Sequence, residues 1–425
     1  MKLAILGEDL VAWTLAGALA STGCQVSMTA CTLPDANSEE LEPDLFTLLT
    51  QQLASERLVL SCGVQALAEQ GVSLLIDARE HLNAEQLYQT LQQLGFPPVV
   101  ALVQAVPLGT TDTLQTRLQQ EAQVATAVVY WPNFIQAGRA LQSFTRVEQL
   151  LVGSQDKRAV AMIKRLMVPF NRSQDRFKEV TASEAELTKI AINGMLATRI
   201  SYMNELAALA TCKGIDIEAV RQCMGADSRI GYQYLYPGCG FAGAAFSHSL
   251  TQLEKELVSV NAGDAGLLAS VQRINAQQKD LLFQKLWRFY KADLAGKRVA
   301  IWGAAYKPNT ASVSGSPALH LIQTLLDNGV TVQVYDPRAL PNLQQRLGKP
   351  SGLQFCASAE AALEQADALM LITEWKEFWN ADLQNLKNRM RTPLLLDGRN
   401  VYEPALLAEQ GWIYSGVGRG EVIHY

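Results

Sequence analysis

Two polar side chains lie four residues apart in a long stretch of sequence that is predicted to be helical. The stretch Glu184–Cys212 contains no proline and a single glycine. Within it, Lys189 and Asn193 are one helical turn apart, so their side chains share one face of the predicted helix. An ammonium and a carboxamide on one face can reach the same cluster of ligand oxygens. The pair is a candidate binding site, and the alternative is a solvated polar face without a ligand.

Two cationic side chains follow apolar runs in the last third of the chain. Arg399 stands in Asp-Gly-Arg, directly after the apolar run Leu394–Leu396, and Lys307 stands in Tyr-Lys-Pro-Asn. A guanidinium can hold a diphosphate through paired donors. Both residues are candidates for binding a phosphorylated ligand only through the resemblance to a known family that is described below. For both, the alternative is a turn residue that only contacts solvent.

The glycine-rich stretch Pro237–Ser249 contains one cysteine and one histidine. Cys239 is a candidate nucleophile, but a free cysteine is usually a small buried hydrophobe and nothing nearby in the sequence lowers its pKa. His248 is a candidate acid or base, and an exposed loop histidine is the alternative. The other three histidines share no metal-ligand spacing, so we predict no metal site; they are His81, His320 and His424.

Composition excludes several classes of protein. Of 425 residues, 48% are hydrophobic and 18% charged, which allows large cores. The net charge of −5 and the lack of a basic run argue against a nucleic-acid partner. Glu8 and Asp9 interrupt the apolar N-terminal run, and no run reaches the roughly 18–20 apolar residues of a membrane span. The seven scattered cysteines contain no C-x-x-C pair, so we expect reduced thiols and a cytoplasmic protein.

The first 180 residues show the pattern of a doubly wound sheet. Lys2–Leu6 is an apolar run that ends at Gly7. Leu10–Leu19 then repeats apolar side chains at helical spacing, and Cys24–Thr29 is predicted to be the next strand. An amphipathic stretch at Ala84–Leu94 is predicted to be a helix. Further strands are predicted at Leu74–Ile76, Val99–Val103 and Ala127–Val129.

A helical middle part separates this first domain from a second α/β unit. Ser183 and Glu186 form a capping-box pattern at the start of the long helix. Helical stretches continue to about Tyr290, and a second strand-turn-helix-strand pattern begins at Lys297. Its predicted elements are strands at 298–303, 331–336, Ala368–Ile372 and Leu394–Leu396, and a helix at Pro317–Leu326. We therefore expect an α/β protein with domains at residues 1–182, 183–294 and 295–425.

The chain resembles the UDP-glucose/GDP-mannose dehydrogenase family over essentially its whole length. The matching blocks, in the family's order, are EPDLFTLL (42–49), AVPLGT (105–110), WPNFIQAGRAL (131–141), ELTKIAINGMLATRISYMNEL (186–206), SRIG (228–231), PGCGFAG (237–243), WGAAYKPNT (302–310), VYDP (334–337), ADALMLITEWKEF (366–378) and DGRNVY (397–402). The resemblance implies a Rossmann-like N-terminal domain, an all-helical central domain with one long helix, and a Rossmann-like C-terminal domain. It also implies a homodimer formed through the long helix.

Members of this family oxidise a sugar alcohol to a carboxylate and reduce two NAD per turnover, with a cysteine that captures the aldehyde. At the family's NAD positions this chain keeps Gly7 and an acceptable Ala12, but Asp9 stands at the second glycine of the turn. Ala30 replaces the acid that holds the ribose, and Ser314 replaces an arginine that faces the cofactor. Asp77–Glu80 replaces the family's V-G-T-P element. These changes predict that NAD is not bound in the family manner, so no cofactor is predicted.

The family's catalytic positions are changed as well. Ala245 stands where the family has its nucleophilic cysteine, and Ser249 where it has the aspartate that activates water. Asn133 replaces a glutamate, Ala137 an acid, and Ala105 a threonine. The positions that resemble the family's contacts to the sugar nucleotide are retained; they are Lys189, Asn193, Arg229, Gly240, Lys307 and Arg399.

This pattern favours a non-catalytic member of the family that binds a UDP-sugar, or that regulates or scaffolds an active paralogue in polysaccharide synthesis. The second hypothesis is a divergent but active NAD-dependent dehydrogenase, in which oxidation without a nucleophile stops at an aldehyde or ketone. The third is a structural subunit without a ligand. The fold alone does not decide between them, because function depends on the site.

Overall fold

The first strand, β1 (Lys2–Leu6), buries both of its faces. In the computed structural model of the chain, Leu3 and Ile5 pack into one hydrophobic core, and Ala4 and Leu6 pack into another. Side chains alternate in this way along a strand because its period is two residues. A strand that is buried on both faces is typical of a parallel sheet with helices on both sides.

The structure describes residues 1–35, 38, 41–68, 71–80, 83–171, 176–260 and 266–420. The chain divides into two compact units, and each is described by itself. The first unit is Met1–Ile192 with His248–Val260, and the second is Asn193–Ser247 with Asn261–Tyr425. The three domains expected from the sequence stay a prediction.

The sheet of the first unit has the strand order β3-β2-β1-β4-β5-β6-β7-β8. Its strands pair in parallel, except that β6 and β7 are antiparallel. Besides β1, they are β2 (Gln25–Met28), β3 (Leu58–Leu60), β4 (Leu74–Asp77), β5 (Val99–Leu102), β6 (Ala127–Tyr130), β7 (Leu150–Gly153) and β8 (Phe177–Val180). The order reverses at β1, whose neighbours are β2 and β4. In such sheets, ligands bind beyond the carboxyl ends of the strands at this switch point.

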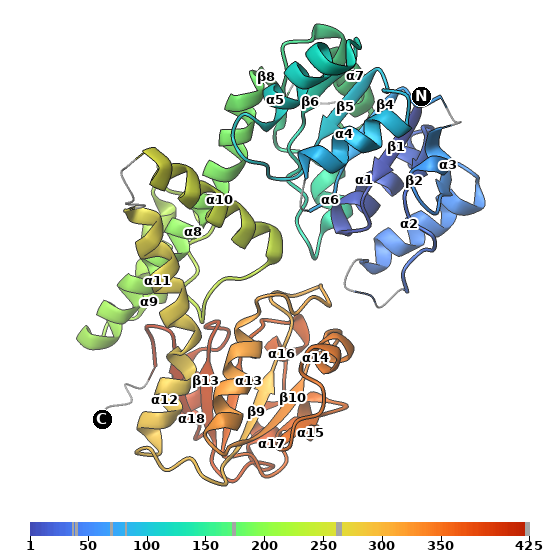
Figure 1. The fold of residues 1–425 in the computed structure, drawn as a ribbon. Coiled ribbons are helices and arrows are strands. Elements are labelled where there is room, and N and C mark those ends of the chain that lie inside the picture. The colour runs from blue at the N-terminus through green and yellow to red at the C-terminus, as the bar shows by residue number, and fades with distance from the viewer. Residues whose placement is uncertain are drawn as a thin grey trace. The chain divides into compact units, whose positions relative to one another are not determined.

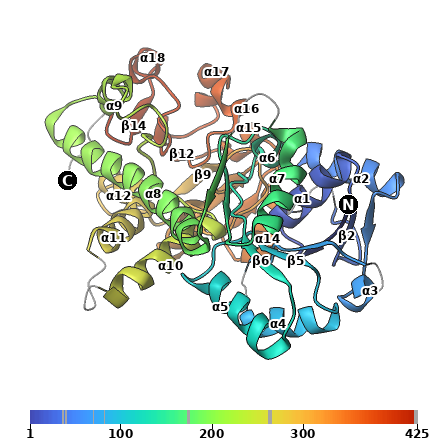
Figure 2. The ribbon, with the colours of Figure 1, turned by 90° about the horizontal axis from the view of Figure 1, so that it is seen from above.

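Helices cover both faces of this sheet (Figures 1 and 2). The helices on one face are α1 (Leu10–Ser21), α2 (Pro43–Ala54), α6 (Ala140–Thr145) and α7 (Lys157–Met167). The helices on the other face are α3 (Gln65–Ala68), α4 (Ala84–Gln93) and α5 (Thr110–Arg117). A π-helical turn at Leu118–Ala122 and a 3₁₀ turn at Val168–Phe170 complete the described part of this domain.

The middle of the chain is helical. Its helices are α8 (Ala182–Lys213), α9 (Ile217–Ala226), α10 (Ala244–Val260), α11 (Leu267–Lys279) and α12 (Leu281–Phe289). The predicted capping box at the start of α8 is wrong by two residues, because Thr181 and Glu184 exchange the two reciprocal hydrogen bonds. Glu186 instead accepts hydrogen bonds from the backbone of Gly109 and from both the backbone and the hydroxyl of Thr111.

The sheet of the second unit is parallel throughout its described strands and has the order β11-β10-β9-β12-β13-β14. The strands are β9 (Arg298–Trp302), β10 (Thr331–Tyr335), β11 (Leu353–Phe355), β12 (Ala368–Leu371), β13 (Leu394–Asp397) and β14 (Ile413–Gly416). The helices are α13 (Pro317–Asp327), α14 (Leu340–Leu347), α15 (Ala359–Ala362), α16 (Lys376–Trp379), α17 (Leu383–Lys387) and α18 (Pro404–Glu409). The predicted fold class is confirmed: the chain has two Rossmann-like sheets with a helical central region.

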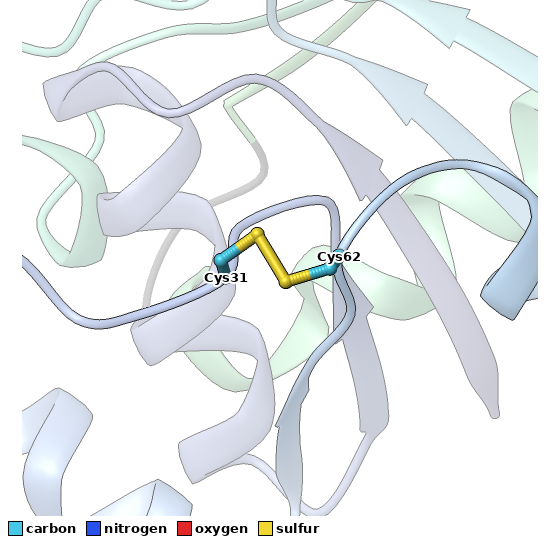
Figure 3. Close-up of a disulfide and its surroundings, with 2 residues drawn as sticks. All are labelled: Cys31 and Cys62. Carbon is cyan, nitrogen blue, oxygen red and sulfur yellow. A yellow bond between two sulfur atoms is a disulfide. The ribbon is translucent and has the colours of Figure 1, made fainter.

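No helix among the described residues is long and apolar enough to cross a membrane. One prediction about the cysteines is wrong. Cys31 follows β2 and Cys62 follows β3, and Figure 3 shows the disulfide that joins them. The two strands are parallel neighbours with Met28 opposite Leu60, so their carboxyl ends lie side by side and bring the two cysteines together. The other five cysteines are free thiols.

Candidate functional site

The turn after β1 keeps the geometry of a dinucleotide-binding turn at its first glycine. Gly7 has a φ of +128°, in the region that favours glycine, and a Cβ built there comes within 3.1 Å of the carbonyl carbon of Ala78. The backbone N–H of Gly7 donates to the hydroxyl of Thr29 at 3.3 Å. The tight turn thus requires glycine at this position and is tied to the end of β2.

Asp9 caps the N-terminus of α1. Its Oδ1 accepts from the backbone N–H of Ala12 at 2.8 Å, and its Oδ2 accepts from Nε2 of Gln104 at 2.7 Å. Burial, with a further contribution from the charge of Glu80, raises the pKa of Asp9 to about 6. The carboxyl group therefore occupies the amide-rich end of the helix, where an anion would bind, and it holds a proton more readily than an ordinary aspartate.

The end of β2 and the end of β4 differ in charge. Ala30 is buried, and its methyl side chain provides no carboxylate that could hold a ribose hydroxyl. The Asp77–Glu80 segment after β4 contains an ion pair, because Arg79 donates from Nε to the Asp77 carboxylate at 2.9 Å. Asp77 is buried, so this pairing satisfies a charge that would otherwise be costly.

Gln104, which was not among the residues predicted from the sequence, connects the turn after β1 to the segments that follow β4 and β6. It is the second residue after the last residue of β5. Its Nε2 also donates to the carbonyl of Ala78 at 3.0 Å, and its Oε1 accepts from Nδ2 of Asn133 at 3.3 Å. Asn133 donates in addition to the carbonyl of Val103 at 2.7 Å. A polar residue immediately after an apolar strand was the signal that could have identified Gln104.

Lys189 lies at the end of this hydrogen-bonded chain. Its Nζ donates to the backbone carbonyl of Asn133 and lies 5.1 Å from the ring centroid of Phe134. Burial lowers the pKa of Lys189 to about 8, so a fraction of the amine is neutral near physiological pH. The structure therefore links Asp9, Gln104, Asn133 and Lys189 along the carboxyl edge of one sheet.

The other predicted positions near this edge carry no titratable group. Ala105 is buried beside Gln104, and Ala137 is half-buried in the segment after β6. Asn193 lies one turn after Lys189 on α8, as the spacing predicts, and is half-buried.

In the second unit, neighbouring residues fix the orientation of the Arg399 side chain. Its backbone N–H donates to Oδ1 of the buried Asp397, and its Nε donates to the carbonyl of Ile372 at 2.6 Å. The same Nε lies 3.3 Å from Oε2 of Glu374. Among the described residues, none accepts a hydrogen bond from the two Nη atoms of Arg399. The side chain of Arg399 is largely buried, with 19% of its surface exposed.

The glycine-rich segment packs against this arginine. A Cβ built on Gly238 comes within 3.0 Å of Nη1 of Arg399. Gly240 has a φ of +103°, and the segment there is held by Asn275, which accepts from the backbone N–H of Phe241. Cys239 is buried, and burial raises the pKa of its thiol, so it is a core side chain and not an activated nucleophile.

Lys307 and Ser314 lie in the segment between β9 and α13. The Nζ of Lys307 is 5.5 Å from the ring centroid of Tyr306. That ring also lies 3.1 Å from a Cβ built on Gly243, so the glycine permits close contact between the two segments. Ser314 is exposed, and its N–H donates to the hydroxyl of Ser312.

Within the described part of the chain, no contact connects Arg229 to the residues around Lys189 or to those around Arg399. Its side chain is 86% exposed and pairs with Asp227 at 2.7 Å, directly after α9. An exposed pair of this kind contributes little to stability. Arg229 therefore lies on a surface, where it is available to another molecule.

The glycine-rich stretch ends earlier than its composition indicates. Helix α10 begins at Ala244, so Ala245, His248 and Ser249 are helical and not part of a loop. Ala245 is exposed in the first turn, and Ser249 is buried. Among the described residues, no group of three His, Cys, Asp or Glu side chains could hold a metal ion. His81 and His424 lie outside the described residues.

Two family models match the chain. Residues 183–277 match the central domain of the UDP-glucose/GDP-mannose dehydrogenase family. Residues 300–404 match the UDP binding domain of the same family. The second match contains Lys307, Ser314 and Arg399, and the first contains Lys189 and Asn193.

Full-length relatives are similar to the chain. It is 35% identical to a UDP-glucose 6-dehydrogenase of Pseudomonas aeruginosa, over 100% of this chain and 99% of the relative. It is 31% identical to a UDP-glucose 6-dehydrogenase of Rhizobium meliloti, over 80% of this chain and 78% of the relative. A solved UDP-glucose dehydrogenase of Pyrobaculum islandicum matches with a TM-score of 0.85 and 25% identity, over 98% of this chain and 97% of that one. A UDP-D-ManNAc dehydrogenase of Pyrococcus horikoshii shows the same fold, with a TM-score of 0.82 and 22% identity over 99% of this chain and 100% of that one.

These relatives correct the functional prediction made from the sequence. The favoured hypothesis, a non-catalytic binder or scaffold, is wrong, because a relative that is 35% identical over the whole chain is an oxidoreductase. The comparisons support the second hypothesis, an active dehydrogenase.

Proposed function

The chain belongs to the UDP-glucose/GDP-mannose dehydrogenase family, and from this premise we propose that it is an NAD-dependent oxidoreductase that acts on a nucleotide sugar. The observation that carries the proposal is the full-length similarity to UDP-glucose 6-dehydrogenases. The Lys189 amine, held at Asn133 and with its pKa lowered to about 8, supports it.

The turn after β1 fits a dinucleotide when Asp9 carries a proton. Gly7 keeps the tight turn, in which a Cβ would contact Ala78. An ionised Asp9 would repel a pyrophosphate, whereas the protonated carboxyl is neutral and can donate a hydrogen bond to it. Because the pKa of Asp9 is already about 6, the proton is available at modest cost. NAD, when bound, supplies the acceptor for a hydride.

Lys189 is the group that takes the proton of the sugar alcohol in this proposal. An amine with a pKa near 8 is partly neutral at pH 7, and a base is most effective when its pKa lies near the working pH. Its hydrogen bond to the backbone carbonyl of Asn133 orients the amine. Asn193, one turn further along α8, is placed to hold an oxygen of the same ligand.

The proposed reaction stops at the aldehyde. Ala245 has a methyl group where the family has a cysteine thiolate, so no covalent adduct forms at that position. Conversion of the alcohol to the aldehyde removes two electrons and two protons: NAD, when bound, would accept them in part as a hydride, and Lys189 would take the remaining proton and pass it to solvent. One NAD is then reduced for each sugar, instead of two.

Arg399 is proposed to bind the diphosphate of the nucleotide sugar. Its Nε is fixed by Ile372, and its Nη atoms make no hydrogen bond to the described residues. A fixed guanidinium with two available nitrogens matches the paired oxygens of a diphosphate. The match of residues 300–404 to a UDP binding domain supports this assignment, with Lys307 and Gly240 as neighbouring contacts.

A homodimer through α8 is part of the proposal. Three large apolar side chains on this helix are strongly exposed and stand seven residues apart, at Met195 (63%), Tyr202 (52%) and Leu209 (55%). A repeat of seven places them along one stripe, and such a stripe is covered in most proteins by a partner. Light scattering would show a dimer for the wild type, whereas the variant Met195→Lys with Tyr202→Lys would be monomeric. A monomeric wild type would overturn this part.

A cytoplasmic location stays a prediction.

The test is turnover by the purified chain with NAD and a panel of UDP- and GDP-sugars. We expect an increase in reduced nicotinamide for at least one sugar, and an aldehyde product that a hydrazine reagent traps in a one-to-one ratio. Lys189→Met should abolish the signal. Absence of reduced nicotinamide with every sugar would overturn the proposal. A uronate product with two reduced nicotinamides per sugar would overturn only the aldehyde step.

A further inference from the structure

The Cys31–Cys62 disulfide lies at the carboxyl edge of the first sheet, on the side of the switch point where β2 ends. Cys31 is the second residue after Thr29, and Cys62 is the second residue after the last residue of β3. Both cysteines are exposed, so a reagent in solution can reach the bond. An exposed disulfide is more accessible to thiol exchange than a buried one.

The segment that carries Cys31 is directly connected to the dinucleotide turn. Thr29 donates its backbone N–H to the carbonyl of Ile5, and its hydroxyl accepts the backbone N–H of Gly7 at 3.3 Å. Ala30, between Thr29 and Cys31, is buried at the position where the ribose of a dinucleotide lies in this fold. The disulfide therefore anchors the segment Thr29–Cys31, in which the hydroxyl of Thr29 accepts the hydrogen bond from the amide of Gly7.

Across the sheet edge, the disulfide has a second anchor. The backbone N–H of Ser61, the residue before Cys62, donates to the carbonyl of Met28 at 2.9 Å. Ser61 is buried, so this end of the bridge is fixed to the sheet. The cross-link thus joins the carboxyl ends of β2 and β3, which are also paired along the sheet from Val26 to Met28 and from Leu58 to Leu60.

We propose that Cys31–Cys62 is a thiol-exchange site whose oxidised form stabilises the dinucleotide-binding conformation of the turn after β1. A dithiol is the reagent class that would open it. One thiolate of the dithiol attacks one sulfur of the bridge and forms a mixed disulfide, and the second thiolate then displaces the other cysteine. The protein gains two electrons and two protons as two thiols, and the dithiol leaves as a cyclic disulfide.

The expected consequence is weaker NAD binding after reduction. The oxidised bridge fixes the position of Thr29, and through it that of Gly7, before NAD binds. Less conformational entropy is therefore lost when NAD binds. A coupling of this kind typically changes affinity by about fivefold or more. This inference rests on the proposed function, because it assumes that NAD is the ligand of this turn.

The experiment measures NAD affinity by calorimetry on the full chain in two redox states. Non-reducing peptide mass mapping first establishes that Cys31 and Cys62 are joined in protein prepared in an oxidising buffer. We expect the dissociation constant for NAD to rise about fivefold after treatment with dithiothreitol. The double variant Cys31→Ser with Cys62→Ser should match the reduced wild type in both buffers. Cys223→Ser, which removes an exposed free thiol from α9, should keep the full response.

Hydrogen exchange gives a readout that does not depend on turnover. Reduction should speed exchange of the amides of Gly7 and Ala30, while those of β12 in the second sheet stay unchanged. Cysteines that remain free thiols in an oxidising buffer would overturn the inference. Equal NAD affinity in the two redox states would also overturn it, while the proposed function stands. If neither state binds NAD although the bridge is present, the inference and the proposed function both fail.

Discussion

Asp9 and Gln104 are joined by a hydrogen bond of 2.7 Å, from Nε2 of Gln104 to Oδ2 of Asp9. The bond connects the start of α1 with the end of β5, and Asn133 extends it toward Lys189. Gln104 donates, so this contact favours the ionised carboxyl, whereas burial favours the neutral one and is the larger effect. Protonation of Asp9 is thus balanced near neutral pH, at the place where a dinucleotide would bring negative charge.

Replacing Asp9 by asparagine should tighten NAD binding. The substitution removes the charge and retains a side-chain oxygen that can cap α1, so little helix stability is lost. At pH 8, two units above the pKa of about 6, only about one carboxyl in a hundred is protonated. If NAD binds the protonated form, Asp9→Asn should lower the dissociation constant by up to about 100-fold at this pH. Calorimetry measures it, and an unchanged or weaker affinity would contradict the assignment.

The pH dependence of NAD binding follows from the same group. The raised pKa means that the carboxyl is mostly protonated below about pH 6 and ionised above it. Affinity should therefore be nearly constant below pH 6 and fall about tenfold for each unit above it. The Asp9→Asn variant should show no such slope. A wild-type affinity that is flat between pH 5 and pH 8 would show that Asp9 does not meet the ligand.

Most of the fold could be predicted from the sequence, and three of the strands that were not predicted lack a long continuous apolar run. Runs such as Lys2–Leu6 are buried on both faces and read as continuous apolar segments. The strands β3 and β11 are only three residues long, and the middle residue of each is exposed. They therefore do not form a long continuous apolar run that could be recognised in the sequence. β8 contains two exposed charged residues, Lys178 and Glu179, because it forms the edge of its sheet.

The site was predictable only in part, because its contacts join distant segments. The spacing of Lys189 and Asn193 placed both on α8, as found. The disulfide was missed because Cys31 and Cys62 are 31 residues apart and meet only through the pairing of β2 with β3. The effect of Asp9 on NAD binding stays a prediction, because the protonation of its carboxyl group depends on burial and on Gln104, and a sequence pattern shows neither.

Lys189 should determine the rate and its dependence on pH. Only the neutral amine can accept a proton, so turnover should rise about tenfold per pH unit below about 8 and level off above it. Lys189→Met should lower kcat by about 10²- to 10⁴-fold. Lys164→Met, on an exposed face of α7, is the matched control and should keep wild-type turnover. A pH profile that persists unchanged in Lys189→Met would assign the base to another group.

Arg399 should determine the affinity for the nucleotide sugar. Arg399→Lys keeps the charge but loses the paired nitrogens, so KM should rise about tenfold or more while kcat changes little. Arg389→Ala removes an arginine that pairs with Glu364 on the surface, and it should leave KM unchanged. Initial rates at saturating NAD separate the two constants. A fall in kcat without a change in KM would mean that Arg399 acts on the reacting group instead of on the diphosphate.

Opening the disulfide should lower the stability of the first unit. A cross-link restricts the unfolded chain, and for a loop closed over 31 residues the expected loss is about 3–4 kcal/mol. Guanidinium unfolding in the presence of dithiothreitol should therefore begin at lower denaturant concentration than in an oxidising buffer. The double variant Cys31→Ser with Cys62→Ser should behave like the reduced protein in both buffers, whereas Cys223→Ser should keep the difference, because Cys223 is free. Coincident unfolding curves for the oxidised and reduced wild type would show that the bridge adds no stability to the folded unit.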